Sequence, residues 1–349
     1  MRCLVWEMPR RGGFAHPLCD SDFRVHPLPH FYPCAILGVM RVTASAPGKV
    51  ILFGEHAVVY GRPAIAVPVM QVRATAEVEP GSAGGGLRIV AADLGRTLSL
   101  LDAPEDEPLA AIVRLTLAHL GIETAPDAVI IIRSTIPIAS GMGSGAAVSS
   151  ALAKALASYC GRTLEAGEVS ALVFEVDKLY HGTPSGIDNT VIAYERPVYF
   201  VKGEPPQPFQ IARPFTLAIA DTGIASPTKM AVGDVRRAWQ AHRDRYERLF
   251  DRIGQIVRVA RRAIERGDVE ALGPLLDENH RLLQEMGVSS VELDRLAEAA
   301  RAAGALGAKL SGAGRGGNLI ALIRADQAEA VSTALRAAGA KGVIVTQVD

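Results

Sequence analysis

The sequence lacks three features that would place it among common classes of binding or membrane proteins. It has no net charge, because 37 lysine and arginine residues balance 37 aspartate and glutamate residues, so a nucleic acid is not expected as a partner. It has no apolar run of the roughly 18 residues that cross a bilayer. Its four cysteines show no C-x-x-C spacing, which argues against a zinc site. We therefore expect a soluble, cytoplasmic protein that binds neither membranes nor nucleic acid.

The N-terminal segment, residues 1–39, lacks any helical or strand periodicity. Prolines at positions 9, 17, 27, 29 and 33 interrupt it, and it has no apolar stretch followed by a cleavage site, as a secretory signal would have. We expect a disordered or misassigned extension. Our hypothesis is that translation begins at Met40, directly before the first expected strand.

The length of 349 residues exceeds the usual size of one domain, so we expect two packed domains that share a cleft. Prolines gather between positions 203 and 214, and we place the boundary there. A nucleotide-binding domain would then occupy residues 40–205, and a second domain residues 206–349.

Hydrophobic periodicity predicts that helices and strands are mixed in both domains. Strands are expected within residues 41–79 and at 128–136, 191–194, 198–201 and 216–220, and helices at 109–120, 146–157 and 164–180. The chain is then mostly helical, with a capping box formed by Ser289 and Glu292. It closes with strands at 308–310, 319–323 and 343–348 and a helix at 327–338.

A glycine-rich link between an apolar strand and a helix is the central motif. It reads Pro137-Ile-Ala-Ser-Gly-Met-Gly-Ser-Gly-Ala146. A helix N-terminus offers unpaired N–H groups and a partial positive charge, and glycines let the backbone close around an anion. The motif predicts a phosphate cradle, although a tight packing turn is an alternative.

Two other phosphate-binding motifs compete with this interpretation. The P-loop pattern is absent. Gly141, Gly143 and Ala146 do match the dinucleotide fingerprint G-x-G-x-x-A, which leaves an oxidoreductase as an alternative. That fingerprint requires a second strand that ends in an acid about 20 residues on, whereas residues 163–180 have a helical pattern.

Three further segments carry candidate functional residues. Lys49, Glu55 and His56 surround an apolar strand, and titratable groups in that arrangement favour a site. His181-Gly-Thr-Pro-Ser-Gly-Ile-Asp188-Asn189 is a stiff turn that would present Asp188 just before a strand. Gly312-Ala-Gly-Arg-Gly-Gly317 lies between two expected strands and predicts a tight turn at the floor of the cleft.

Taken together, these motifs resemble the GHMP kinase superfamily over residues 41–349, and within it the branch that phosphorylates mevalonate. The resemblance implies an α+β, two-domain fold, with an N-terminal nucleotide domain like domain 2 of ribosomal protein S5 and a ferredoxin-like C-terminal domain. It implies an ATP- and Mg²⁺-dependent kinase that phosphorylates the 5-hydroxyl of mevalonate in isoprenoid synthesis. Two alternatives stay open: another small-molecule kinase of the superfamily, such as a phosphomevalonate kinase, and a non-catalytic binding protein of the same fold. The chain could act as a homodimer.

The resemblance also assigns residues position by position. It places the catalytic aspartate at Asp188 and the catalytic lysine at Lys49, which suits a reaction that needs an oriented hydroxyl and a cation at the transferring phosphate. Lys49 and Asp188 would also contact the acceptor, together with Glu55, His56 and Thr228. It implies ATP binding by Pro137, Ile138, Ala139, Ser140, Gly141, Met142, Gly143, Ser144, Gly145, Ala146, Ala147 and Gly314.

The implied magnesium site departs from the family pattern. The family loop usually ends Gly-Ser-Ser-Ala and binds the metal through its second serine, whereas this chain has Gly145 there. A family glutamate that binds magnesium falls on Asp177. Because Mg²⁺ accepts a few carboxylate or hydroxyl oxygens together with water and phosphate, we expect Asp177 and either Ser144 or a water to hold it.

Overall fold

The computed structural model describes residues 41–137, 140–181, 184–226 and 228–349, and all of these belong to one compact unit. The expectations for residues 1–39 and for a start at Met40 lie outside the described residues. No helix within the described ranges has both the length and the apolar character needed to cross a membrane.

The first sheet is formed by the strands that precede residue 209. They are β1 (Val42–Phe53), β2 (Ala64–Pro80), β3 (Leu87–Ala91), β4 (Arg96–Ser99), β5 (Ala128–Ser134), β6 (Val198–Phe200) and β7 (Gln207–Pro208). Their order is β4-β3-β5-β2-β6-β7, with β1 paired to β2. The alternation predicted in β2 is confirmed, because Val72, Ala74, Ala76 and Val78 are buried while the residues between them are not.

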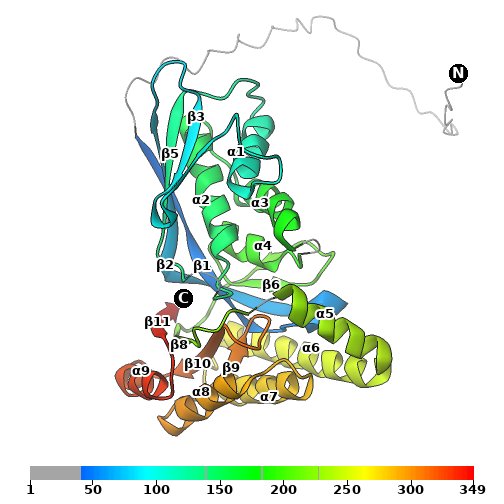
Figure 1. Cartoon of the computed structure of the whole chain (residues 1–349). Coiled ribbons are helices and arrows are strands. Elements are labelled where there is room, and N and C mark those ends of the chain that lie inside the picture. The colour runs from blue at the N-terminus through cyan, green and yellow to red at the C-terminus, as the bar shows by residue number, and fades with distance from the viewer. Residues whose placement is uncertain (1–40, 138–139, 182–183, 227) are drawn as a thin grey trace, which may run out of the picture. The chain divides into compact units, whose positions relative to one another are not determined.

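Four helices accompany this sheet, namely α1 (Pro108–His119), α2 (Ser144–Tyr159), α3 (Ala166–His181) and α4 (Ile187–Tyr194). Helix α2 packs directly on β1 and β2, and in Figure 1 it runs along the sheet between the strands and α3. Its alanines, among them Ala147, Ala151 and Ala155, are fully buried, and such small side chains allow a helix to approach a sheet closely.

The strand predicted at residues 191–194 is wrong, because these residues end helix α4. Gly186 has a left-handed backbone (φ 90°) and precedes the first residue of the helix. Ile187 and Val191 are then buried one turn apart. A helix of eight residues is too short for its apolar spacing to be told from that of a buried strand.

The second sheet is antiparallel and has the order β11-β8-β10-β9. Its strands are β8 (Phe215–Asp221), β9 (Gly307–Ser311), β10 (Asn318–Ile323) and β11 (Gly342–Val348), and its helices are α5 (Thr228–Ala241), α6 (Arg243–Arg266), α7 (Leu272–Glu285), α8 (Val291–Ala302) and α9 (Ala328–Ala337). The predicted β-β-α-β ending is confirmed, and the strand order is that of a ferredoxin-like sheet. The two sheets divide near residue 209, but the predicted domain boundary itself stays a prediction.

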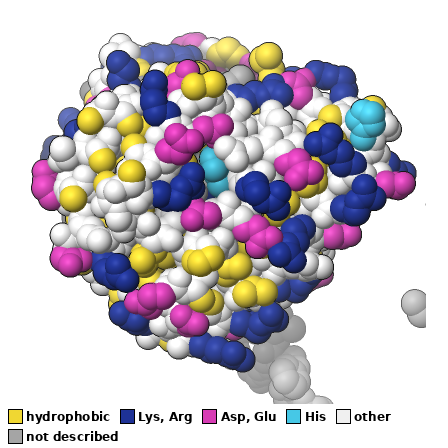
Figure 2. All heavy atoms as spheres, turned by 90° about the horizontal axis from the view of Figure 1, so that it is seen from below, with side chains coloured by type: hydrophobic (Ala, Val, Ile, Leu, Met, Phe, Trp, Pro, Cys, Tyr) yellow, Lys and Arg dark blue, Asp and Glu magenta, His cyan; other side chains and the backbone are white. Residues whose placement is uncertain are grey.

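Charges of both signs are mixed on the face drawn in Figure 2, and no large area of that face carries one sign alone. This distribution agrees with the balanced composition of the chain. It gives no extended basic surface there that could follow a polyanion.

Candidate active site

The glycine-rich link forms the start of helix α2. Gly143 lies immediately before the helix with a left-handed backbone (φ 72°), and no side chain caps the helix. The first N–H groups of a helix have no partner within it, so this end can bind an anion. Added Cβ atoms at Gly141 and Gly145 would meet nothing within 4 Å. Ile138 and Ala139 of the predicted ATP site lie outside the described residues.

Lys49 and Asp188 meet in front of this loop. The Lys49 Nζ lies 2.9 Å from Asp188 Oδ1, with Lys49 buried and the Asp188 side chain 38% exposed. Lys49 follows a register shift in β1 between Pro47 and Gly48, and its backbone N–H donates to Met142 O at 3.0 Å. Asp188 lies in the first turn of α4, not before a strand as predicted.

Gly143 brings the phosphate loop into contact with this pair. A Cβ atom there would lie 3.1 Å from Lys49 Cγ and 2.7 Å from Ile192 Cδ1. The aliphatic stem of Lys49 therefore lies directly against the N-terminal end of α2, where only a glycine fits. The structure thus brings together the predicted anion cradle, the predicted cation and the predicted carboxylate.

Asp177 of helix α3 supplies a second carboxylate. Burial, and after it the charge of Asp188, raise its pKa to about 7 against the opposing effect of Lys49. These effects place Asp177 in the electrostatic field of the Lys49–Asp188 pair. No cluster of three or more His, Cys, Asp or Glu side chains within the described ranges could hold a metal ion by itself. A cation here would need oxygen ligands from water or phosphate.

Glu55 and His56 lie in a second, fully buried cluster. Glu55 forms an ion pair with Lys309, and neither side chain is exposed. Burial raises the pKa of Glu55 and lowers that of Lys309. The Glu55 Oε2 atom is buried without a hydrogen-bond partner, so the carboxylate retains an acceptor for a ligand hydroxyl.

His56 reaches the glycine turn between β9 and β10. Its Nε2 donates to Ala313 O at 3.0 Å, and burial lowers its pKa to about 4, so the imidazole is neutral at neutral pH. Its backbone has a positive φ of 60°, which is uncommon for a residue other than glycine. Backbone strain of this kind is found often at functional sites.

The glycine turn is tied to the phosphate loop and to the start of α5. Asn318 Nδ2 donates to Ser140 O at 2.6 Å, and Ser226 Oγ donates to Gly314 O at 2.6 Å. A Cβ at Gly314 would lie 1.9 Å from Val288 O, so the turn requires glycine there. Thr228, the first residue of α5, is exposed.

The sequence interpretation gave no role to two residues of this site, Lys309 and Asn318. Lys309 is the one charged residue of strand β9, in which every residue is buried, and a lysine in an apolar strand should have indicated a buried counter-charge. Asn318 directly follows the glycine turn and begins β10.

The predicted helix at 164–180 is confirmed as α3, which excludes the second strand that a dinucleotide fold needs there.

Comparison with known proteins identifies two domain families in the chain. The model of the GHMP kinases N terminal domain matches residues 109–196, and that of the GHMP kinases C terminal domain matches residues 260–341. The mevalonate kinases of Thermococcus sibiricus and Pyrococcus horikoshii are each 36% identical to the chain. The alignments cover 87% and 86% of this chain, and 96% and 94% of those proteins, respectively.

Solved structures of related proteins share the fold. The mevalonate kinase of L. major in complex with R-mevalonate has a TM-score of 0.76 and 31% identity, with coverage of 88% of this chain and 95% of that chain. The mevalonate kinase of Methanococcus jannaschii has a TM-score of 0.77 and 25% identity, with coverage of 88% and 98%. A Streptococcus pneumoniae phosphomevalonate kinase, at 16% identity and a TM-score of 0.75, shares the fold alone.

Proposed function

Because the chain belongs to the GHMP kinase family, we propose that it transfers the γ-phosphoryl group of ATP to the 5-hydroxyl of mevalonate. The observation that carries this proposal is the Lys49–Asp188 ion pair, which lies against Gly143 at the uncapped start of α2. The relatives that match most of the chain at 36% identity are named mevalonate kinases. The phosphomevalonate and non-catalytic alternatives have no comparable support.

In this proposal Asp188 orients the acceptor hydroxyl and receives its proton. The Asp188 side chain is partly exposed, and its position on a helix turn fixes it beside Lys49. Lys49 would then neutralise charge on the transferring phosphoryl group. Phosphoryl transfer depends mainly on positioning and on electrostatic stabilisation, and these two side chains supply both.

The ATP phosphates would lie on the amides between Gly141 and Ala147. Glycine at 141, 143 and 145 keeps this surface free of side chains, and the helix dipole favours negative charge there. Ser140 and Gly314 would act through the backbone, because Asn318 and Ser226 hold their carbonyl groups.

Asp177 and Ser144 fit a magnesium site completed by phosphate and water. Asp177 is a buried carboxylate whose pKa is raised first by burial and then by the charge of Asp188, so a cation beside it would be stabilising. Ser144 begins α2 on the side of the phosphate loop. When bound, Mg²⁺ would neutralise charge on the phosphate oxygens.

Glu55, His56 and Thr228 would line the acceptor pocket. Glu55 offers an unpaired carboxylate oxygen, and the neutral His56 is fixed by its bond to Ala313. We further propose a cytoplasmic enzyme of isoprenoid and lipid metabolism, which could act as a monomer or as a homodimer.

A panel of acceptors with purified protein and MgATP tests this function. Mevalonate should give ADP formation and a phosphorylated product by mass spectrometry, whereas phosphomevalonate, galactose and homoserine should not. A preference for one of the other acceptors would contradict the assignment of the substrate. Nucleotide binding without turnover on any acceptor would favour the non-catalytic alternative.

A further inference from the structure

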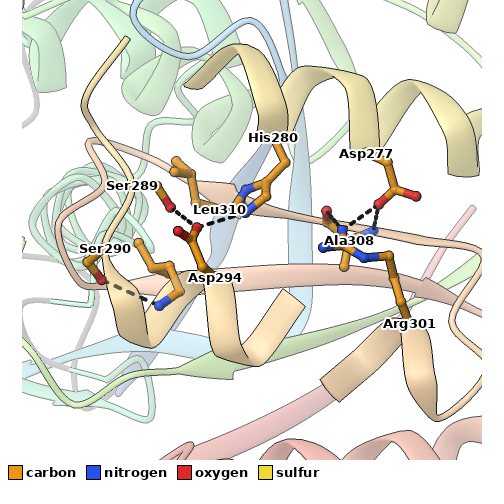
Figure 3. A network of polar contacts seen from close by, with 9 residues as sticks. Asp277, His280, Ser289, Ser290, Asp294, Arg301, Ala308 and Leu310 are labelled. Carbon is orange, nitrogen blue, oxygen red and sulfur yellow. Dashed lines mark hydrogen bonds and ion pairs between the residues drawn. The ribbon is translucent and has the colours of Figure 1, made fainter. Parts of the chain in front are cut away.

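Strand β9 lies at one edge of the second sheet. The backbone N–H and C=O groups on its outer side form hydrogen bonds with side chains. Ala308 N donates to Asp277 Oδ1 at 3.0 Å, and Arg301 Nη1 donates to Ala308 O at 3.3 Å. Leu310 N donates to His280 Nδ1 at 3.2 Å. Helices α7 and α8 thus supply the partners that a further strand would otherwise provide, as Figure 3 shows.

The tautomer of His280 is fixed by its second contact. His280 Nε2 lies 3.1 Å from Asp294 Oδ1, and a carboxylate oxygen accepts, so Nε2 carries the proton and Nδ1 is free to accept from Leu310. Ser289 Oγ donates to the same Asp294 oxygen at 2.5 Å. The predicted capping box is thereby corrected, because the side chain that caps α8 is that of Ser290, not Ser289.

The charged groups around His280 leave it neutral. Burial is the main cause that lowers its pKa to about 4; Asp294 opposes this shift, and Lys309 and Arg301 contribute to it. A protonated imidazole would present N–H to the N–H of Leu310, so the observed bond requires the neutral form.

The strand held in this way carries residues of the candidate site. The Lys309 Nζ donates to Leu310 O and to Glu55 Oε1. Ser311 Oγ accepts from Ile51 N at 3.0 Å and donates to Ile51 O at 2.9 Å, which joins β9 to β1. A displacement of Leu310 would therefore move the cation that orients Glu55.

We propose that His280 is a positioning residue for the acceptor pocket, because its hydrogen bond to Leu310 N holds β9 where Lys309 can orient Glu55. The inference rests on the proposed function, since Glu55 is assigned there to the acceptor. His280 itself contacts neither substrate. Its loss should therefore weaken binding of the acceptor and leave binding of ATP unchanged.

Two substitutions separate this role from simple packing. In His280→Asn the side-chain oxygen lies near the position of Nδ1 and can still accept from Leu310 N. In His280→Gln the amide nitrogen can reach Asp294, but the acceptor for Leu310 is lost. Leu335→Ala, in a fully buried position on α9, is a matched control for lost stability, because α9 packs on β8 and β11.

We expect His280→Gln to raise KM for mevalonate about tenfold, the effect of one lost hydrogen bond, with KM for ATP unchanged. His280→Asn should restore KM for mevalonate, and Leu335→Ala should lower Tm alone. Asp294→Asn, which frees the tautomer, should act like His280→Gln but more weakly. An equal rise in both KM values, or no difference between His280→Gln and His280→Asn, would overturn the proposal.

Amide hydrogen exchange tests the positioning role of His280 independently of the proposed function. Amides of residues 307–311 should exchange faster in His280→Gln than in His280→Asn, whatever substrate the wild-type protein uses. Equal exchange in the two variants would contradict the positioning role. Absence of turnover on mevalonate by the wild-type protein would contradict the proposed function instead.

Discussion

Gly143 and Lys49 are in such close contact that a single added methyl group would collide with the lysine stem. The hypothetical Cβ lies 3.1 Å from Lys49 Cγ and 2.7 Å from Ile192 Cδ1, and the backbone at Gly143 has a positive φ. This contact places the start of α2 beside the side chain that we propose stabilises the transferring phosphoryl group.

Gly143→Ala should therefore impair both stability and nucleotide binding. The strained backbone and the collision should together cost about 1–3 kcal/mol of unfolding free energy, and Kd for ATP should rise. Gly145→Ala is the matched control, because a Cβ there meets nothing within 4 Å. Denaturant melts and nucleotide titrations of the two variants measure the difference; equal effects would contradict the proposed packing.

The substitution Gly145→Ser should improve the magnesium site. The space around position 145 accepts a side chain, and the hydroxyl would add an oxygen next to Ser144 at the start of α2. We expect a lower magnesium concentration for half-maximal activity than in the wild-type protein and in Gly145→Ala. An unchanged magnesium requirement would mean that the metal does not approach residue 145.

The pKa of about 7 at Asp177 predicts a pH-dependent metal site. Magnesium binds the deprotonated carboxylate, so its apparent affinity should fall as pH decreases through about 7, and binding should release a proton. Because this pKa is raised in the folded state, the buried charge costs stability as pH rises from about 4 to 7. Asp177→Asn should therefore raise Tm at pH 8 while it weakens magnesium binding.

Calorimetric titration of magnesium nucleotide in two buffers of different ionisation enthalpy measures this proton release. Wild-type protein should release a proton near pH 7, and Asp177→Asn should not. Equal proton release by both proteins would assign the titrating group elsewhere.

The buried Glu55–Lys309 pair predicts an asymmetry between single and double substitutions. Lys309→Met leaves the Glu55 charge buried without a counter-ion and should cost about 3–5 kcal/mol of stability. The double variant Glu55→Leu, Lys309→Met should recover much of this loss, because it removes both charges. It should still have a high KM for mevalonate, as measured by steady-state kinetics on folded protein; a normal KM would remove Glu55 from the acceptor pocket.

Two buried histidines predict a loss of stability in acid. Burial lowers the pKa of both His56 and His280 to about 4. Unfolded histidine titrates near about 6.5, so the unfolded chain binds more protons below that pH and stability falls between about 6.5 and 4. Urea melts across this pH range should show that the free energy of unfolding falls less steeply in His280→Asn than in the wild-type protein. An equal fall in both proteins would mean that His280 does not cause the loss of stability in acid.

Much of the fold could be predicted because its elements are long and periodic. The alternation in β2 and the alanine-rich pattern of α2 each identify one structure. Helix α4 was mistaken for a strand, since eight residues with apolar side chains at both spacings do not separate the two periods. The resemblance nevertheless assigned Asp188 and Lys49 to one site, and the two side chains form an ion pair, because a motif assigns residues independently of the local element.

The contacts that complete the site could not be predicted, since they join residues more than 170 positions apart. Lys309 pairs with Glu55 across 254 positions, and Asn318 with Ser140 across 178. Spacing along one sequence carries no information on such pairs. Lys309 and Asn318 reach their partners only because the folded sheet places β9 and β10 beside the first part of the chain.

In the proposed function, Asp188 and Lys49 promote phosphoryl transfer at the start of α2. Its most direct test is single-turnover transfer from γ-labelled ATP to mevalonate, compared between the wild-type protein and Asp188→Asn at saturating substrates. We expect the rate to fall roughly 10²- to 10⁴-fold while Kd for ATP is unchanged. Transfer at the wild-type rate by Asp188→Asn would contradict the claim.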